Sequence, residues 1–246
     1  MASTSIPLTT PPFAPKTVQA LAELGIHTIA DIRQTGAVKT FLLLKAAGHT
    51  VTRSVLWQLH AVAQGKTVGE VDEQEKAELN SALKQHPPVD IFPPQAEMEG
   101  FMAAALQQAE AAAALGEIPV GAVVVRNGEI IAAAHNACVS QHDISRHAEI
   151  AALAAAGQTL GNYRLNDCDV YITLEPCTMC ASALLQARVR RVIFAAAEPK
   201  TGAAGSILNL FSDGRLNKHT AVLGGICARQ AQAVLQRFFD ERRKQQ

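Results

Sequence analysis

Hydrophobic positions in the first third of the chain recur at helical spacing. Pro15 suits the first turn of the first apolar segment, and Gly25 follows that segment as a typical stop signal. Asp72 can cap a last helix that reaches about Gln85. Glycines separate the segments between these two, which predicts further helices over residues 28–35, 37–47 and 51–64. With no β-patterned segment among them, residues 1–86 are predicted to form a small all-α domain.

The helical pattern stops at residues 87–96. Residues 87–94 contain four prolines, which exclude a helix or a central strand and favour an extended connector. We therefore interpret residues 87–96 as a linker, and residues 97–246 as a second domain.

Beyond the linker, helical and strand periods alternate. An Ala-rich helix predicted over residues 98–115 precedes a short apolar segment at 120–125, typical of a strand buried on both faces. Asn127-Gly128 then predicts a tight hairpin. The returning strand is expected at 129–134, and a helix that carries His147 and Leu153 follows it. Further strands are expected at 169–174 and 191–197, and further helices at 177–187 and 228–244. This order predicts an α/β domain with a mixed sheet covered by helices.

Composition narrows the range of functions. Among 246 residues, 22 basic side chains balance 22 acidic ones, so any nucleic-acid binding must depend on a local patch rather than on net charge. No apolar segment is long enough to span a bilayer, and the N-terminus lacks a secretory pattern. The five cysteines have no disulfide-scaffold spacing. These features favour a cytoplasmic protein without membrane contact.

The strongest chemical signal is His147-Ala-Glu149, followed by Pro176-Cys177-Thr-Met-Cys180. One imidazole and two thiols are good zinc ligands, and three protein ligands leave the fourth tetrahedral position to water, as in catalytic sites. The thiols lie at a predicted helix start, where the helix dipole favours thiolates and Pro176 suits the first turn. Glu149 is placed to carry protons beside that water.

A structural zinc site, or unrelated core thiols, would be the simpler interpretation. A structural site needs a fourth protein ligand, but Cys138 and Cys168 have no suitable spacing and are expected in the core or at the surface. The combination His-x-Glu with Pro-Cys-x-x-Cys is the signature of zinc nucleobase deaminases, in which the glutamate is not a ligand. We therefore predict one catalytic zinc ion per chain.

Several blocks of sequence resemble the bacterial tRNA-specific adenosine deaminases of the cytidine deaminase superfamily. The blocks are residues 147–150, 161–165, 173–180 and 200–206, and the similarity extends over about 97–243. The resemblance implies a three-layer α/β/α fold, a homodimer, and zinc-dependent hydrolytic conversion of adenosine to inosine at the wobble position of tRNA anticodons. It further implies specific roles for five residues: zinc ligands His147, Cys177 and Cys180, proton shuttle Glu149, and Asn136 as a hydrogen-bonding partner of the target base.

Substrate contacts are expected in the loop at 198–206 and near the C-terminus. Glu198 stands where the family often has Asp, and Lys200 lies on the substrate side of this loop. The anticodon stem-loop of a tRNA requires phosphate contacts. Besides Lys200, the candidates are three arginines between a predicted helix and strand (Arg188, Arg190 and Arg191) and the C-terminal cations Arg237, Arg242, Arg243 and Lys244. Phe238 and Phe239 are candidates for stacking on bases, although at least one is expected to anchor the last helix.

Two other functions remain open on the sequence alone. The chain could deaminate a free base or nucleoside such as guanine or cytidine, although such an enzyme has no need of a basic C-terminus. It could also be a binding module with a vestigial deaminase fold, an interpretation that the intact Glu149 argues against. Residues 144–146 and 228–230 also depart from the family pattern. These departures affect the expected contacts with the substrate and leave the metal chemistry unchanged.

The N-terminal region has a resemblance of its own. Residues 14–17, 21–26 and 28–32 resemble the C-terminal domain of TfoX-type competence regulators. That family has a helix-hairpin-helix character, and such hairpins can offer backbone N–H groups to phosphates, but Ala14 replaces the usual glycine. A packing or partner-docking module is the simpler interpretation, and the sequence does not identify its partner.

Overall fold

The computed structural model describes residues 6–217 and 219–244. Contacts between Cα atoms divide the chain into two compact units, Met1–Ile91 and Phe92–Gln246. Within the described residues, no helix combines the length and the apolar character that crossing a membrane requires.

The first unit consists of helices around one apolar core. Its elements are α1 (Pro15–Glu23), α2 (Ile29–Thr35), α3 (Ala37–Ala46), α4 (Arg53–Gln64), the 3₁₀ helix η1 (Val68–Glu70) and α5 (Glu73–Gln85). All the predicted helices are present, and only η1 was not expected. Gly25 follows α1 with φ +73° and allows Ile26 N to donate back to Leu21 O at 2.9 Å. The core includes Leu21, Ile32, Phe41, Leu44, Leu56 and Leu59.

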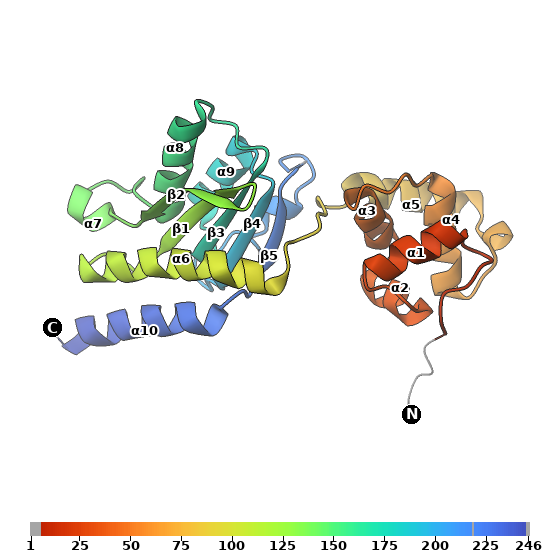
Figure 1. Cartoon of the computed structure of the whole chain (residues 1–246), viewed down its shortest axis with the longest axis horizontal. Helices are drawn as coiled ribbons and strands as arrows, with labels where there is room; N and C mark the ends of the chain where they lie inside the picture. Colours follow the sequence, from red (N-terminus) through yellow and green to blue (C-terminus); the bar gives the residue numbers. More distant parts are fainter. Residues whose placement is uncertain (1–5, 218, 245–246) are drawn as a thin grey trace. The chain divides into compact units, whose positions relative to one another are not determined.

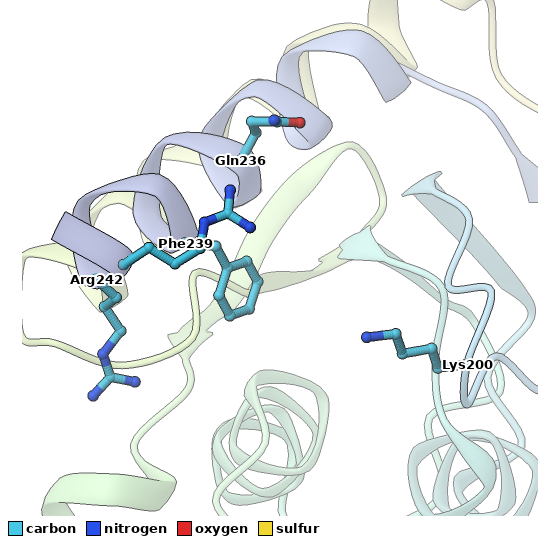
Figure 2. A pocket seen from close by; sticks show the side chains of 5 residues that line it. Lys200, Gln236, Phe239 and Arg242 are labelled. Atoms are coloured by element: carbon cyan, nitrogen blue, oxygen red, sulfur yellow. The ribbon is translucent and has the colours of Figure 1, made fainter. Parts of the chain in front are cut away.

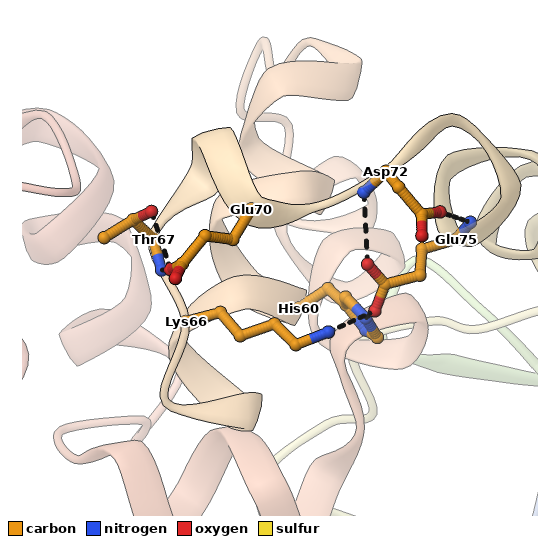
Figure 3. A network of polar contacts seen from close by, with 6 residues as sticks. All are labelled: His60, Lys66, Thr67, Glu70, Asp72 and Glu75. Atoms are coloured by element: carbon orange, nitrogen blue, oxygen red, sulfur yellow. Dashed lines mark hydrogen bonds and ion pairs between the residues drawn. The ribbon is translucent and has the colours of Figure 1, made fainter.

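A polar network fixes the start of α5 (Figure 3). The Asp72 carboxylate accepts a hydrogen bond from Glu75 N at 2.7 Å, and the Glu75 carboxylate accepts one from Asp72 N at 3.1 Å, which is a capping box. Glu75 Oε1 also accepts from Lys66 Nζ at 2.8 Å and lies 3.4 Å from His60 Nε2. These donors, Lys66 first and Asp72 N second, lower the pKa of Glu75 to about 2.

The lowered pKa of Glu75 predicts a pH-dependent contribution to stability. Its ordinary value is 4.5, so the ionised carboxylate stabilises the fold fully above about pH 4.5, and the contribution disappears as pH falls through 2. We therefore expect Glu75→Gln to lower the melting temperature at pH 6 and to have a much smaller effect at pH 2.5, as measured by circular dichroism. Glu73→Gln is the matched control, because Glu73 is 90% exposed. Equal effects of Glu75→Gln at both pH values would contradict the prediction.

The second unit is an α/β domain. Its elements are α6 (Gln95–Ala114), β1 (Gly121–Arg126), β2 (Glu129–His135), α7 (Cys138–Gln141), α8 (Ala148–Leu160), β3 (Cys168–Leu174), α9 (Thr178–Ala187), β4 (Arg191–Ala196), the 3₁₀ helix η2 (Leu210–Ser212), β5 (Ala221–Gly224) and α10 (Ala228–Lys244). The strand order is β2-β1-β3-β4-β5. Strand β1 is antiparallel to both β2 and β3, whereas β3, β4 and β5 are parallel. The predicted mixed sheet is confirmed, while α7, η2 and β5 were not expected.

Helices cover both faces of this sheet, with α8 and α9 on one face and α6 and α10 on the other (Figure 1). The central strands are buried on both faces because successive side chains point to opposite sides. Val124 and Ile172 belong to the core on the α8–α9 side. Val123 and Tyr171 belong to the core on the α6 side, where the Phe101 ring packs 5.2 Å from that of Tyr171. The three-layer α/β/α architecture is therefore confirmed.

The two ends of the parallel strands differ in chemistry. At the start of β3 and β4, Asp169 and Arg191 are paired in register and form a bidentate ion pair with N···O distances of 2.7 and 2.6 Å. The other end leads from Leu174 and Ala196 into loops. Binding sites of α/β sheets lie beyond the carboxyl ends of the strands, and the residues predicted to be functional are found at this end.

Candidate active site

Three predicted zinc ligands lie together at the starts of two helices. His147 Nδ1 is 3.8 Å from Cys177 Sγ and 3.4 Å from Cys180 Sγ, and the ligand atoms of all three lie within 4.8 Å of one another. Zinc binds sulfur at about 2.3 Å and nitrogen at about 2.0 Å, so its tetrahedral ligands are roughly 3.5–4 Å apart. Both the donor set and its spacing therefore fit a single zinc ion.

The helix starts differ from the prediction by one position. His147 and Cys177 are the N-cap residues of α8 and α9, with extended backbones (φ −68°, ψ 147° and φ −70°, ψ 174°). The prediction that His147 lies at the N-terminus of its helix is confirmed, whereas the prediction of Pro176 in a first turn was wrong, because Pro176 precedes the N-cap. An extended N-cap directs its side chain across the helix end, which is how both residues reach Cys180 in the first turn of α9.

The titration of the two thiols is unequal. A hydrogen bond from the Cys180 thiol, aided by His147, lowers the pKa of Cys177 to about 3. The pKa of Cys180 is raised, because its thiol donates to Cys177 and is buried near Glu149. The pKa of His147 is raised by its hydrogen bond to Cys177. A cation bound between the sulfurs would remove the asymmetry, because thiols that ligate a metal are deprotonated.

Glu149 lies in the first turn of α8 with a side chain that is only 3% exposed. Its Oε2 has no hydrogen-bond partner among the described residues, and burial raises the pKa of the carboxyl group. A buried oxygen without a partner costs free energy. Because Glu149 lies next to the His-Cys-Cys group, we infer that its unpartnered oxygen takes part in the chemistry of the site rather than in stabilising the fold.

His147, Cys177 and Glu149 line one pocket of about 390 Å³. Apolar walls come from Ile118, Val120, Leu174 and Leu235, and polar groups from Asn136, Glu149, Glu198 and Lys200. A small number of convergent polar groups on an apolar wall is typical of small-molecule sites. The structure thus places six of the predicted site residues in the lining of this one pocket, and the seventh, Cys180, is fully buried next to His147.

Asn136 is fixed between the pocket and the start of α8. Its Oδ1 accepts a hydrogen bond from Ala148 N at 2.9 Å, and the side chain is only 6% exposed. The resemblance implied that this amide hydrogen-bonds the target base. Because Ala148 N already occupies Oδ1, the amide NH₂ is the group that remains for a ligand.

Glu198 and Lys200 line the pocket from the segment of residues 198–206, which we name the substrate-side loop. Glu198 Oε1 accepts from Lys200 N at 2.8 Å. This bond closes a tight turn that carries the exposed Lys200 side chain. One carboxylate oxygen of Glu198 is therefore occupied in shaping the loop.

A second pocket of about 660 Å³ adjoins the first and shares Lys200 and Phe239 with it (Figure 2). Arg242 stacks on the Phe238 ring at 5.4 Å, and the remaining lining residues are Gln236 and Arg243. Phe238 is buried and anchors α10, whereas Phe239 is 44% exposed, a division that the sequence anticipated.

Three of the predicted phosphate contacts already have carboxylate partners. Arg191 pairs with Asp169 at the opposite end of the sheet from the pocket. Arg237 binds Glu110 of α6 at 2.6 Å, and Arg243 pairs with Asp240 on its own helix. Both pairs are exposed and contribute little to stability. Lys200 and Arg242 have no carboxylate partner among the described residues, so they are the cations most available to a ligand at this pocket.

The sequence pattern assigns no role to two buried glutamates, Glu117 beside the pocket and Glu175 in its lining. Glu117 accepts from Val139 N at 3.0 Å and from Ser140 N at 2.7 Å, which fixes the start of α7. Glu175 accepts from backbone N–H groups of the substrate-side loop. Burial opposes ionisation of both groups, but the hydrogen bonds outweigh it and lower both pKa values. The only sequence signal was an acidic residue within an otherwise apolar segment.

The fold and the site define a deaminase. A family model described as MafB19-like deaminase matches residues 96–243. The chain is 41% identical over 146 residues to a tRNA-specific adenosine deaminase of Bacillus subtilis (strain 168), covering 59% of this chain and 91% of that protein. It is 44% identical over 148 residues to the corresponding protein of Haemophilus influenzae, covering 60% and 86%. The chain therefore belongs to the family of tRNA-specific adenosine deaminases.

Solved structures agree with this assignment. One from a study of A-to-I editing by tRNA:A34 deaminases at the wobble position of transfer RNA has 40% identity and a TM-score of 0.54, covering 55% of this chain and 99% of that one. A guanine deaminase from Nitrosomonas europaea shares the fold, with a TM-score of 0.51 at 24% identity, covering 64% and 90%. The TfoX C-terminal domain model matches residues 11–83, so both resemblances noted in the sequence are confirmed.

Proposed function

We propose that this protein hydrolytically deaminates adenosine to inosine at the wobble position of tRNA anticodons, using one zinc ion per chain held by His147, Cys177 and Cys180. The observation that carries the proposal is the pairing of this donor set with Glu149, a buried carboxylate with an unpartnered oxygen in the same pocket. Family membership supports the choice of tRNA adenosine as substrate.

Each pocket residue has a defined task in this reaction. Bound zinc supplies a nucleophile at neutral pH by lowering the pKa of its water ligand to about 7. Two protons pass through Glu149 Oε2 in turn: the first goes from the attacking water to the ring nitrogen, and the second goes from the new hydroxyl group to the amine, which leaves as ammonia. This task suits a carboxyl group whose pKa is raised by burial. Asn136 donates from its NH₂ group to the edge of the base. Val120 and Leu174 pack against the base and exclude water.

The tRNA contacts outside the pocket must come from local charge, because the net charge of the chain is zero. Lys200 and Arg242 at the adjoining pocket can bind phosphates of the anticodon loop, and the exposed ring of Phe239 offers a stacking surface for a base. A free-base deaminase has no use for such a surface. We accordingly place the protein with its tRNA substrate in the cytoplasm.

The test is a comparison of three substrates. Purified protein is incubated with an anticodon stem-loop or whole tRNA that carries wobble adenosine, and inosine is read by sequencing or mass spectrometry; free guanine and cytidine are assayed in parallel. Inosine at the wobble base alone is expected. Turnover of guanine or cytidine with unmodified tRNA would establish the alternative function, and turnover of none of the three would leave only a binding module.

We also propose that the protein is a homodimer formed through α8 and α9. The outer faces of these helices line a shallow cavity of about 680 Å³ with Ile150, Leu153 and Ala183, beside the 69% exposed ring of Tyr163. An apolar surface of this kind is typical of protein interfaces.

Ala154→Arg should convert the dimer to a monomer, because it places a charge on this apolar face without removing any core side chain. Sedimentation at micromolar concentration measures the change. Ala103→Arg, at an exposed position of α6, is the matched control and should stay dimeric. A dimeric Ala154→Arg variant would place the interface elsewhere.

We further propose that the chain consists of a helical domain at 1–86, a proline-rich linker at 87–96 and the deaminase domain at 97–246. Phe92 packs against the core around Met98, so the shortest useful fragment begins with Phe92. We expect residues 92–246 to keep kcat/KM for tRNA within about threefold of the full chain. A fragment that folds, as shown by circular dichroism, but is inactive would make the helical domain part of the substrate site.

A further inference from the structure

The buried side chain of Glu175 joins two parts of the active site. It lies between the end of β3 and the N-cap Cys177 of α9, and it is only 3% exposed. Its Oε1 accepts from Ala204 N at 2.9 Å and from Ser206 N at 3.0 Å. Its Oε2 accepts from Glu198 N at 3.0 Å and from the Ser206 hydroxyl. One carboxylate thus holds both ends of the substrate-side loop.

Further backbone contacts connect the same two segments. Ala203 N donates to Pro176 O at 2.9 Å, and Gly202 forms an isolated β-bridge with Cys177. A Cβ atom at Gly202 would lie 2.5 Å from Glu175 Cδ and 2.5 Å from Glu198 O. No side chain fits at this position, because loop and carboxylate are packed too closely.

We propose that Glu175 is a positioning residue that holds the substrate-side loop against the metal-binding turn, and so sets where Glu198 and Lys200 meet the tRNA. The proposal rests on the proposed function and deepens it. Glu175 lines the pocket, but all four hydrogen bonds that it accepts come from the loop, and both of its oxygens are occupied by them. Its effect on catalysis is therefore exerted through the loop.

A carboxylate suits this task better than any neutral side chain. Every donor that faces Glu175 is an N–H or O–H group, so the side chain must accept at both oxygens. Hydrogen bonds to a charged acceptor are also stronger than those between neutral groups. In Glu175→Gln one end of the amide becomes an NH₂ donor, and it then faces either Glu198 N or the pair Ala204 N and Ser206 N. One end of the loop is released in either orientation.

The experiment separates loop placement from metal chemistry. In the full chain with zinc bound, Glu175→Gln should raise KM for tRNA about tenfold, because at least one charge-assisted hydrogen bond is lost, while kcat stays within about threefold and zinc remains at one per chain. Gly202→Ala should give the same split, since it displaces the loop while leaving the carboxylate intact. A fall in kcat at unchanged KM, a loss of zinc in Glu175→Gln, or unchanged kinetics would overturn the proposal.

Asp169→Asn is the matched control, because it removes a buried carboxylate from the opposite end of β3, away from the loop. It should lower the melting temperature without changing KM. If Glu175→Gln does not fold, Ser206→Ala replaces it and should raise KM about threefold, having lost one donor; an unchanged KM would again refute the proposal.

Amide hydrogen exchange provides a readout that does not require activity. Ala204 N and Ser206 N should be protected in the wild-type protein and should exchange faster in Glu175→Gln. Equal protection in both proteins would refute the proposal that Glu175 holds the loop. Absence of inosine with the wild-type protein would refute the proposed function, and the exchange comparison would still decide the role of Glu175 in holding the loop.

Discussion

Glu149→Ala should leave one zinc ion per chain and lower kcat for tRNA deamination by about a thousandfold or more. General acid–base catalysis by one side chain contributes roughly 10²- to 10⁴-fold, and Glu149 is the only carboxylate in the pocket with an unpartnered buried oxygen among the described residues. Both proton transfers are assigned to Glu149, so its removal should slow both of them. Zinc content by plasma emission spectroscopy and inosine formation under single turnover measure the two effects.

The isosteric variant Glu149→Gln distinguishes proton transfer from packing. It keeps the volume of the side chain and should be as inactive as Glu149→Ala. Because the carboxylate is buried with an oxygen that lacks a partner, its neutral replacement should not lower stability and is expected to raise it by about 1 kcal/mol. Loss of zinc in either variant would show that Glu149 is a metal ligand, and near-normal turnover would show that another group moves the proton.

The parts of the fold that were predictable are those encoded by neighbouring residues. Asn127-Gly128 forms the hairpin between β1 and β2, with φ values of 52° and 79°. Asp72 caps α5, and α10 begins and ends at the predicted residues. In each case the signal and its structural consequence lie within a few positions, so that local preferences decide the outcome.

The elements that escaped prediction depend on distant partners. Strand β5 is only four residues long and is defined by its pairing with β4. Helix α7 is also four residues long, and the side chain that fixes its start is Glu117, more than 20 positions earlier in the sequence. A segment this short has no hydrophobic period of its own, because its stability comes from tertiary contacts.

The candidate site shows the same division. The spacing of Cys177 and Cys180 could be interpreted locally, but the approach of His147 required the sheet topology that places the starts of α8 and α9 side by side. The role of Glu175 was not predictable, since its donors are 23 to 31 positions away. A buried carboxylate is recognisable as an anchor only after the loop that covers it is known.

Cys180→Ala should remove the zinc ion and with it all measurable turnover. Cys180 is fully buried and its sulfur is 3.4 Å from His147 Nδ1, so the remaining donors would be one imidazole and one thiolate, too few for a protein site that keeps its metal through dialysis. We expect less than about a tenth of the wild-type zinc content, and activity at background even when zinc is added at equimolar concentration.

Cys168→Ala is the control that makes this loss specific to the metal group. Cys168 is also a buried cysteine of the same domain, but it lies at the start of β3, outside the His-Cys-Cys group. Its replacement removes a similar volume from the core and should keep both zinc and turnover. Together with Glu149→Ala, which should retain the ion and lose the chemistry, the two variants separate holding the metal from using it. A Cys180→Ala protein that retained stoichiometric zinc would show that the ion is bound elsewhere, and the assignment of His147 and Cys177 would fail with it.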